Sequence, residues 1–284
     1  MAKRAANHGT AGGHGGEVKK FLPRTGHVLQ EEYNAMSQSP RTVTPERFDA
    51  VLFDLDGVLT DTAKVHAACW KKMFDAFLRN RAAQTGESWQ PFDIDTDYKQ
   101  YVDGKLRYEG VRSFLQSREI QLPFGDPSDP AGRETICGLG NRKNELIQEV
   151  LATDGVEVYE RSLPFVHYLR NVGMRTAVVS ASRNCPAVLA AAGIADLFDV
   201  RVDGEVAGRL HLAGKPAPDT FLEAARQLGV EPARAVVVED AIAGVQAGRA
   251  GQFGLVIGVA RKGEADALRE NGADVVVSDL SELL

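Results

Sequence analysis

Two aspartates follow a short apolar segment near residue 50, and their types and spacing suit phosphoryl chemistry. Residues 50–53 read Ala-Val-Leu-Phe, which predicts a strand buried on both faces, and Asp54 and Asp56 come directly after it. Ligands of open α/β sheets bind at the carboxyl ends of the strands, so both carboxylates are expected to face one crevice. Asp54 could attack phosphorus while Asp56, beyond the bend at Gly57, exchanges a proton with the leaving oxygen. Taken alone, the stretch is explained equally well as an acidic turn.

Three further segments end in polar residues of the types that phosphoryl transfer requires. Ser180 and the pair Glu239-Asp240 each end a valine-rich segment, and Lys215 lies in a Gly-Lys-Pro turn. A lysine supplies fixed positive charge, a serine hydroxyl can bind phosphoryl oxygens, and carboxylates suit Mg²⁺. Each residue has a simple structural explanation by itself. Together they would leave several buried polar groups unexplained, which favours a functional site.

In their order and separation, these four segments resemble the motifs of the haloacid dehalogenase superfamily. The resemblance implies an α/β fold, with a Rossmann-like parallel sheet as the core and an inserted α-helical cap domain. It implies that Asp54 is the nucleophile and that Asp56 is the acid and base. The implied phosphate-binding residues are Ser180, Ala181 and Lys215. The implied cofactor is Mg²⁺, with the ligands Asp54, Asp56 through its backbone carbonyl, and Asp240, supported by Glu239.

Further features of residues 48–284 resemble the β-phosphoglucomutase group of this superfamily. The stretch 54–63 with the histidine that follows it, and the loop Ser-Ala-Ser-Arg-Asn at 180–184, are similar to patterns of that group. Arg107 aligns with an arginine that grips the phosphate that is not transferred. A mutase must hold such a second phosphate, and the guanidinium fork suits that task. The implied substrate-binding residues are Thr62, His66, Arg107, Lys143, Ser182, Arg183 and Asn184.

The reaction implied by the resemblance interconverts β-D-glucose 1-phosphate and glucose 6-phosphate. It runs through an aspartyl phosphate and a 1,6-bisphosphate, with glucose 1,6-bisphosphate as activator, and the cap must exclude water. The nearest alternative is a Mg²⁺-dependent phosphatase that hydrolyses a sugar phosphate or a similar small ester. A second alternative is a non-catalytic binding module, because fold alone does not fix function. The intact set of catalytic residue types argues against that second alternative.

Hydrophobic periodicity divides the chain into an extension, a core and an insertion. Residues 1–45 are polar and rich in glycine and breakers, which predicts a flexible N-terminal extension. Residues 46–63 and 151–284 are expected to form the core, and residues 64–150 the helical cap over the crevice. The predicted later strands are 176–181, 235–239, 255–259 and 274–277. The predicted helices are 64–80 and 139–151 in the cap, and 161–171, 185–191, 219–228, 241–249 and 264–270 in the core.

Bulk composition limits the compartment and the partners. The 284 residues carry a formal net charge of -6, which argues against a nucleic-acid surface. The 3 cysteines form no Cys-x-x-Cys pair, which predicts reduced thiols rather than disulfides or zinc. No apolar run approaches the roughly 20 residues of a membrane helix. We therefore expect a cytoplasmic monomer whose partner is a small phosphorylated sugar, with no nucleic-acid or membrane partner.

Overall fold

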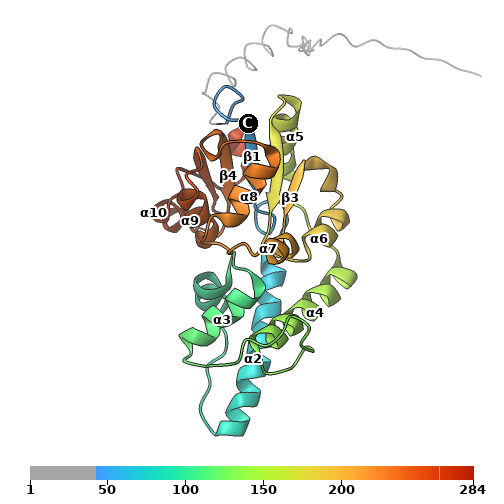
Figure 1. Cartoon of the computed structure of the whole chain (residues 1–284), viewed down its shortest axis with the longest axis vertical. Helices are drawn as coiled ribbons and strands as arrows, with labels where there is room; N and C mark the ends of the chain where they lie inside the picture. The colour runs from blue at the N-terminus through green and yellow to red at the C-terminus, as the bar shows by residue number, and fades with distance from the viewer. Residues whose placement is uncertain (1–42, 262) are drawn as a thin grey trace, which may run out of the picture. The chain divides into compact units, whose positions relative to one another are not determined.

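The computed structural model describes residues 43–261 and 263–284, which form an α/β fold (Figure 1). In this described part, six parallel strands make one sheet in the order β3-β2-β1-β4-β5-β6. The strands are β1 (Ala50–Phe53), β2 (Arg175–Val179), β3 (Val200–Val202), β4 (Ala235–Glu239), β5 (Leu255–Val259) and β6 (Val275–Val277). The predicted parallel-sheet fold is confirmed.

The register of the central strands brings the residues that follow β1, β2 and β4 to one edge of the sheet. Phe53, the last residue of β1, lies opposite Val178 of β2 and Val238 of β4. All four residues of β1 and all five of β4 are buried. Such continuous apolar runs are typical of strands covered on both faces. The polar residues that follow the three strands therefore emerge side by side.

Helices cover both faces of the sheet because alternate side chains of each strand point in opposite directions. Val51 and Phe53 pack into one cluster, and Ala50 and Leu52 pack into the other. The first cluster is covered by α5 (Leu163–Asn171), α6 (Cys185–Ala191) and the 3₁₀ turn η5 (Leu280–Leu283). The opposite face is covered by α8 (Asp219–Leu228), α9 (Ile242–Ala250) and α10 (Ala265–Glu270). Short 3₁₀ turns η2 (Glu160–Ser162), η3 (Ala195–Leu197) and η4 (Pro232–Arg234) connect these elements.

Helices of the segment between β1 and β2 form their own core. They are α2 (Ala63–Thr85), the π-helix η1 (Ile94–Val102), α3 (Arg107–Ser117) and α4 (Ile136–Asp154), and in Figure 1 α2, α3 and α4 lie together below the sheet. Aromatic rings pack in their interior: Trp70 stacks on Phe74 with 5.4 Å between ring centroids, and Phe114 lies tilted against Phe74 with 4.1 Å between centroids. Helices lie at both predicted cap positions and extend further, α2 ending at the left-handed Gly86. We call these four helices and their connecting segments the cap.

Two core elements were missed by the sequence patterns. β3 is only three residues long and has the exposed Arg201 at its centre, so it shows no apolar run, although the alternation of apolar and polar residues over 198–203 was an available signal. The short helix α7 (Gly204–Leu210) follows it, and the Asp203 carboxylate caps this helix by accepting from the backbone amides of Glu205 and Val206. That aspartate was the available signal for a helix start.

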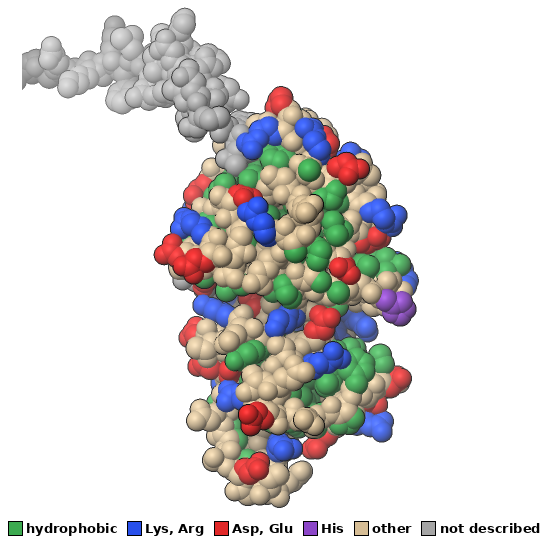
Figure 2. Space-filling model, turned by 60° about the vertical axis from the view of Figure 1, so that its left-hand side comes forward, with side chains coloured by type: hydrophobic (Ala, Val, Ile, Leu, Met, Phe, Trp, Pro, Cys, Tyr) green, Lys and Arg blue, Asp and Glu red, His purple; other side chains and the backbone are tan. Residues whose placement is uncertain are grey.

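The predicted extension 1–45 falls outside the described residues up to position 42. At its end, Val43 is fully buried and packs into the first core cluster. No helix within the described ranges is long and apolar enough to cross a membrane. On the face drawn in Figure 2, acidic and basic side chains are interspersed. A cleft at the carboxyl ends of the strands is lined by the acids Asp54, Asp56, Asp103, Glu239 and Asp240.

Candidate active site

A cleft of about 600 Å³ lies between the strand ends and the cap. Ten of the residues singled out by sequence line it: Asp54, Asp56, His66, Arg107, Lys143, Ala181, Ser182, Asn184, Glu239 and Asp240. Three others lie beside it and contact lining residues: Thr62, Ser180 and Lys215. Arg183 stands in the chain between the lining residues Ser182 and Asn184, and its guanidinium lies over the ring of Tyr108. The structure thus brings residues from distant parts of the chain to one site, while their individual roles stay predictions.

Lys215 forms the charged centre of the cleft floor. Its Nζ donates to Oδ1 of Asp54 and to Oε1 of Glu239, each at 2.5 Å, and to the carbonyl of Val179 at 3.2 Å. The side chains of Lys215, Asp54 and Glu239 are 2%, 9% and 0% exposed. An ammonium group this buried is tolerated because two carboxylates surround it. The floor therefore holds a fixed cation directly beside the predicted nucleophile.

The charges of the floor shift one another's pKa values. Burial raises the pKa of Asp54 well above its usual range, although Lys215 acts in the opposite direction. Burial likewise raises the pKa of Asp240, and the neighbouring acids Asp103 and Glu239 add to the effect. Burial alone would lower the pKa of Lys215, but the attraction of Asp54 and Glu239 outweighs it and raises that pKa. Carboxylates crowded in this way are stabilised by added positive charge.

Two glycines make room for the acids. Gly57 has φ +96°, and a Cβ built on it would lie 1.8 Å from Oδ2 of Asp240. A Cβ on Gly244 of α9 would lie 1.8 Å from Oε1 of Glu239. The backbone amide of Ala241 also donates to Oε2 of Glu239 at 2.8 Å. A side chain at either position would displace a carboxylate, so glycine is required at both positions for the acids to lie where they do.

The carboxylate of Asp56 is held on both oxygens. Thr62 donates from its hydroxyl to Oδ1, and Ser180 donates from its hydroxyl to Oδ2 at 3.2 Å. Nε2 of His66 lies 3.6 Å from Oδ1. His66 lies in the first turn of the cap helix α2 and Thr62 immediately precedes that helix, whereas Ser180 follows β2 of the core. Asp56 is therefore positioned by contacts from both parts of the molecule.

The loop after β2 turns its polar groups toward the cleft. The amide of Ser182 donates to Oγ of Ser180 at 3.1 Å, and the amide of Asn184 donates to Oγ of Ser182 at 3.1 Å. These bonds fix a tight turn whose residues Ala181, Ser182 and Asn184 line the cleft. Arg183 points to the cap instead, with its guanidinium carbon 5.7 Å from the ring centroid of Tyr108. The loop can offer amides and an asparagine side chain to an anion.

Basic and amide side chains of the cap face the acidic floor. Nη2 of Arg107 donates to Oδ1 of Asn144 at 2.7 Å, and Nδ2 of Asn184 donates to the same oxygen at 2.9 Å. This cluster joins α3, α4 and the loop after β2. Its guanidinium still has further donors for a ligand, because a guanidinium carries five N–H groups. An anion bound here would meet Arg107 and Asn184 together.

A second basic group of the cap, Lys143, is buried beside His66. Its Nζ lies 2.8 Å from Nδ1 of His66 and 5.0 Å from the ring centroid of Trp70. Burial, followed by the charge of Arg107, lowers the pKa of Lys143 to about 7. Burial and the charge of Lys143 lower the pKa of His66 to about 4, so His66 is neutral at pH 7. A chain of contacts thus runs from Lys143 through His66 to Asp56.

The pKa of Lys143 predicts a pH dependence of substrate binding. Above about pH 7 the free amine is neutral, whereas a phosphate bound nearby favours the ammonium form, so binding must take up a proton. We expect the KM for the phosphorylated substrate to rise above pH 7, by up to about tenfold per pH unit. Steady-state kinetics between pH 6 and 9 measures this. The Lys143→Met variant should lose the dependence, and a KM of the native protein that stays constant over this range would contradict the expectation.

Several lining residues escaped sequence reasoning as site residues. They are Trp70, Tyr98, Val102, Asp103, Gly104, Lys105 and Ala241, while Asn144 binds both Arg107 and Asn184 at the cleft. Tyr98 donates its hydroxyl to Asp103, whose pKa burial raises to about 6. Trp70 has the spacing of a core aromatic and also reaches the cleft. The Gly-Lys stretch before Arg107 was the one local signal for this part of the cap.

Comparison with known proteins places this site in a family. A family model described as haloacid dehalogenase-like hydrolase matches residues 48–252. The chain belongs to the haloacid dehalogenase-like hydrolase family. The chain is also 53% identical over 243 residues to a β-phosphoglucomutase of Mycobacterium bovis, covering 84% of this chain and 93% of that protein. The predicted family and its β-phosphoglucomutase-like character are confirmed.

Two further relatives are named for two different reactions, one as a mutase and one as a phosphatase. A crystal structure of β-phosphoglucomutase from Clostridium difficile is similar with a TM-score of 0.65 and 27% identity, over 84% of this chain and 93% of that chain. A fructose-1-phosphate phosphatase of Escherichia coli is 30% identical over 210 residues, or 72% of this chain and 93% of that protein. The prediction that the chain is an enzyme, a mutase or a phosphatase, is confirmed.

Phosphotransferases of the haloacid dehalogenase-like family generally use Mg²⁺. Mg²⁺ is held by one or two carboxylates, completing its shell with waters and phosphate oxygens. The buried acids Asp54 and Asp240, whose pKa values are raised by burial and by neighbouring acids, fit this requirement. Across the described residues, no group of three or more His, Cys, Asp or Glu side chains forms a ready-made metal site. The donor set thus fits a cation that shares its shell with substrate.

Proposed function

We propose that this enzyme interconverts β-D-glucose 1-phosphate and glucose 6-phosphate. The transfer proceeds through an aspartyl phosphate on Asp54 and through glucose 1,6-bisphosphate, which also serves as the activator that loads the enzyme. The similarity to β-phosphoglucomutases over more than four fifths of the chain supports this reaction. It also supports a small phosphorylated sugar as the substrate.

The observation that carries the proposal is the presence, at one cleft, of two separate clusters of cationic and amide side chains, of the types that bind phosphates. The first surrounds Asp54 and Lys215 on the core floor, where a phosphoryl group can be transferred. The second is the Arg107, Asn144 and Asn184 cluster on the cap side. A hydrolase acting on a monoester needs one such cluster, whereas a bisphosphate needs two. The arrangement therefore favours an intermediate with two phosphates.

In the first step, a carboxylate oxygen of Asp54 attacks a phosphorus atom of the bisphosphate. The bond from phosphorus to the sugar oxygen breaks, and that oxygen takes the proton carried by Asp56. Lys215, with the hydroxyl and amides that follow β2, stabilises the negative charge on the phosphoryl oxygens. The products are a sugar monophosphate and an aspartyl phosphate, with Asp56 left as a carboxylate.

In the second step, a bound sugar monophosphate attacks the aspartyl phosphate. The attacking group is whichever of its 1- and 6-hydroxyls carries no phosphate. Asp56 takes the hydroxyl proton, the bond between phosphorus and Asp54 breaks, and a bisphosphate forms. When bound, Mg²⁺ supplies charge neutralisation at the phosphoryl oxygens, and we assign it to Asp54, the carbonyl of Asp56 and Asp240, with Glu239 in support. Turning the bisphosphate exchanges its two phosphates between the floor and Arg107.

Water must be kept from the aspartyl phosphate if the sugar is to accept the phosphoryl group. Residues of the cap line the cleft opposite Asp54, and His66 of the cap helix α2 lies 3.6 Å from the Asp56 carboxylate, which the hydroxyl of Thr62, just before α2, also contacts. These contacts support a base that is positioned when the cap is closed over a sugar. The relative named as a phosphatase makes hydrolysis the alternative outcome.

The test is to incubate the enzyme with β-glucose 1-phosphate, Mg²⁺ and a trace of glucose 1,6-bisphosphate. Glucose 6-phosphate and free phosphate are measured in the same samples. We expect glucose 6-phosphate to accumulate with little free phosphate. Release of phosphate in proportion to the sugar consumed, without isomerisation, would show that water is the acceptor and that the chain is a phosphatase.

A further inference from the structure

The chain crosses between core and cap twice, and the two crossings are bonded to each other. Thr60 forms an antiparallel bridge with Val158. The amide of Tyr159 donates to the carbonyl of Leu59, and the amide of Asp61 donates to the carbonyl of Glu157, both at 2.9 Å. We call this pair, residues 57–62 and 156–160, the hinge ribbon. Any movement of the cap against the core must pass through it.

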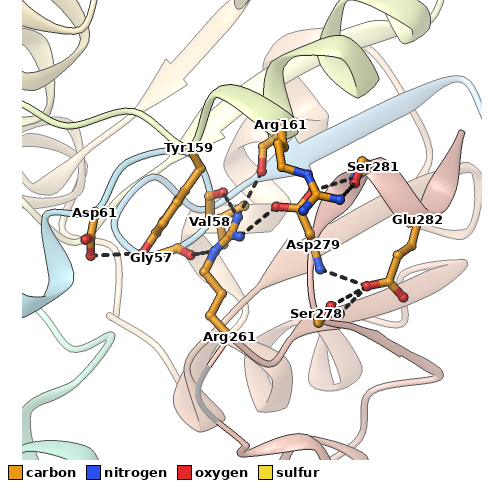
Figure 3. A network of polar contacts seen from close by, with 11 residues as sticks. Gly57, Val58, Asp61, Tyr159, Arg161, Arg261, Ser278, Asp279, Ser281 and Glu282 are labelled. Atoms are coloured by element: carbon orange, nitrogen blue, oxygen red, sulfur yellow. Dashed lines mark hydrogen bonds and ion pairs between the residues drawn. The ribbon is translucent and has the colours of Figure 1, made fainter.

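Arg261, which follows β5 in the core, is bonded to the hinge ribbon (Figure 3). Its Nε donates to the carbonyl of Gly57 and its Nη2 to the carbonyl of Val58, both at 2.9 Å. Its guanidinium carbon lies 3.6 Å from the ring centroid of Tyr159 on the other crossing. One side chain thus contacts both halves of the ribbon.

The same guanidinium also binds two residues outside the hinge ribbon, Asp279 and Ser162. Nη1 donates to Oδ2 of Asp279 at 2.9 Å, and Nη2 also donates to Oγ of Ser162 at 2.8 Å. The side chains of Arg261 and Asp279 are only 15% and 14% exposed. Burial alone would raise the pKa of Asp279, but hydrogen bonds from Ser281 and Arg261 and the charge of Arg261 outweigh it and lower this pKa, so the carboxylate is charged at neutral pH. A half-buried arginine with this many fixed partners is a structural residue rather than a solvated surface residue.

The loop that Arg261 holds is the one that carries Asp56. Within it the amide of Gly57 donates to the carbonyl of Thr60 at 2.7 Å, and the hydroxyl of Thr62 donates to Asp56. On its inner side, Gly57 abuts the carboxylate of Asp240. The outer side is fixed by the two carbonyls bound to Arg261. A shift of this loop would therefore move Asp56 relative to Asp54.

We propose that Arg261 is a positioning residue that sets the place of Asp56 through the hinge ribbon. This proposal rests on the proposed role of Asp56 as the acid that protonates the leaving oxygen. Arg261 fixes the loop while Tyr159, whose hydroxyl donates to Asp61 at 2.9 Å, links the second crossing to the first. The cap can then move about a ribbon whose core end stays fixed.

A lysine cannot replace this arginine. The guanidinium is planar and directs its N–H groups at the two carbonyls, Asp279 and Ser162 simultaneously, whereas an ammonium offers three donors from one point. Arg261→Lys keeps the charge and part of the volume, but it loses the simultaneous grip on Gly57 and Val58. The variant therefore tests geometry rather than charge.

The experiment compares two phosphoryl donors that differ in their need for an acid. The initial rate of Asp54 phosphorylation is measured with glucose 1,6-bisphosphate, whose sugar oxygen must be protonated, and with p-nitrophenyl phosphate, whose leaving group needs no proton. For Arg261→Lys we expect the rate with the bisphosphate to fall by about tenfold or more. The rate with p-nitrophenyl phosphate should change by less than about threefold. Equal falls for both donors, or no fall for either, would overturn the proposal.

Arg249→Lys is the matched control. Arg249 likewise binds a backbone carbonyl, that of Gly272, together with a carboxylate, that of Asp274, but at the end of α9 away from the cleft. Its rates with both donors should equal those of the native enzyme. Tyr159→Phe provides a milder second variant in case Arg261→Lys does not fold. It should lower the bisphosphate rate selectively, and a Tyr159→Phe enzyme with unchanged rates for both donors would count against the hinge ribbon.

Failure of the proposed function would be visible separately. If the native enzyme hydrolyses hexose phosphates without isomerising them, the mutase assignment fails. The comparison then runs between hydrolysis of a hexose phosphate and of p-nitrophenyl phosphate, because the alkoxide leaving group of the former still needs Asp56. A selective loss in Arg261→Lys would still support the positioning role, and an equal loss would still contradict it.

Discussion

Asp54→Asn is expected to lower phosphoryl transfer by about 10⁴-fold or more, because an amide oxygen cannot form the aspartyl phosphate. The fold should be retained. Lys215 keeps its contact with Glu239, and asparagine has nearly the same volume in this buried position. We expect a change in Tm of no more than about 5 °C. Turnover of β-glucose 1-phosphate and a thermal melt measure the two effects.

Asp49→Asn serves as the control for this substitution. Asp49 precedes β1, is 40% exposed and pairs with Arg234 on the surface, far along the strand from the cleft. Loss of the Asp49 charge should leave turnover unchanged, because the residue lies away from the cleft. It should also change the free energy of unfolding little, because exposed ion pairs contribute little to stability. Substantial activity in purified Asp54→Asn, with the control fully active, would refute Asp54 as the nucleophile.

Arg107→Ala is expected to lower mutase turnover by about 10²-fold or more while leaving hydrolysis of p-nitrophenyl phosphate within about threefold of the native rate. The reason is that a bidentate arginine contact to a phosphate is worth several kcal/mol, and each charged hydrogen bond contributes about 1.5–3 kcal/mol. Only a substrate with a second phosphate uses this contact. Steady-state kinetics with the two substrates gives the comparison.

Two further substitutions in helix α3 sharpen the result. Arg107→Lys retains the charge but loses the fork, so its mutase rate should lie between those of the native enzyme and the alanine variant. Arg112→Ala removes an arginine of the same helix that stacks on Phe124, 5.2 Å from the ring centroid, and should not separate the two substrates. Equal losses on both substrates in Arg107→Ala would contradict a second phosphate site.

The strands and helices of the core were largely predictable because their signals are local. The buried runs of β1, β4 and β5 were read from consecutive apolar residues, and glycine marks the end of α8. β3 was missed because it has no apolar run; its signal was the weaker alternation of apolar and polar residues around Arg201. The π-helix η1 was missed although Ile94, Tyr98 and Val102 recur four residues apart, and this spacing was an available signal for a helix.

The residues on the core side of the cleft were predictable from the sequence, whereas several residues on the cap side were not. Asp54, Ser180 and Glu239 each lie at the end of a recognisable strand, and parallel strands bring such ends together. Asn144 and Asp103 lie on cap segments, and their closeness to the cleft depends on how those segments pack. No spacing along the chain encodes that packing. Arg261 escaped for the same reason, because its partners are as far away in sequence as Gly57 and Val58.

The central claim is that a sugar, rather than water, accepts the phosphoryl group from Asp54. Its most direct test starts from enzyme labelled on Asp54 with ³²P from acetyl phosphate in the presence of Mg²⁺. After removal of excess donor, β-glucose 1-phosphate is added and the label is followed. We predict that the label moves into glucose 1,6-bisphosphate faster than it is lost to water. Release of the label as inorganic phosphate, at a rate that the sugar does not change, would contradict the account.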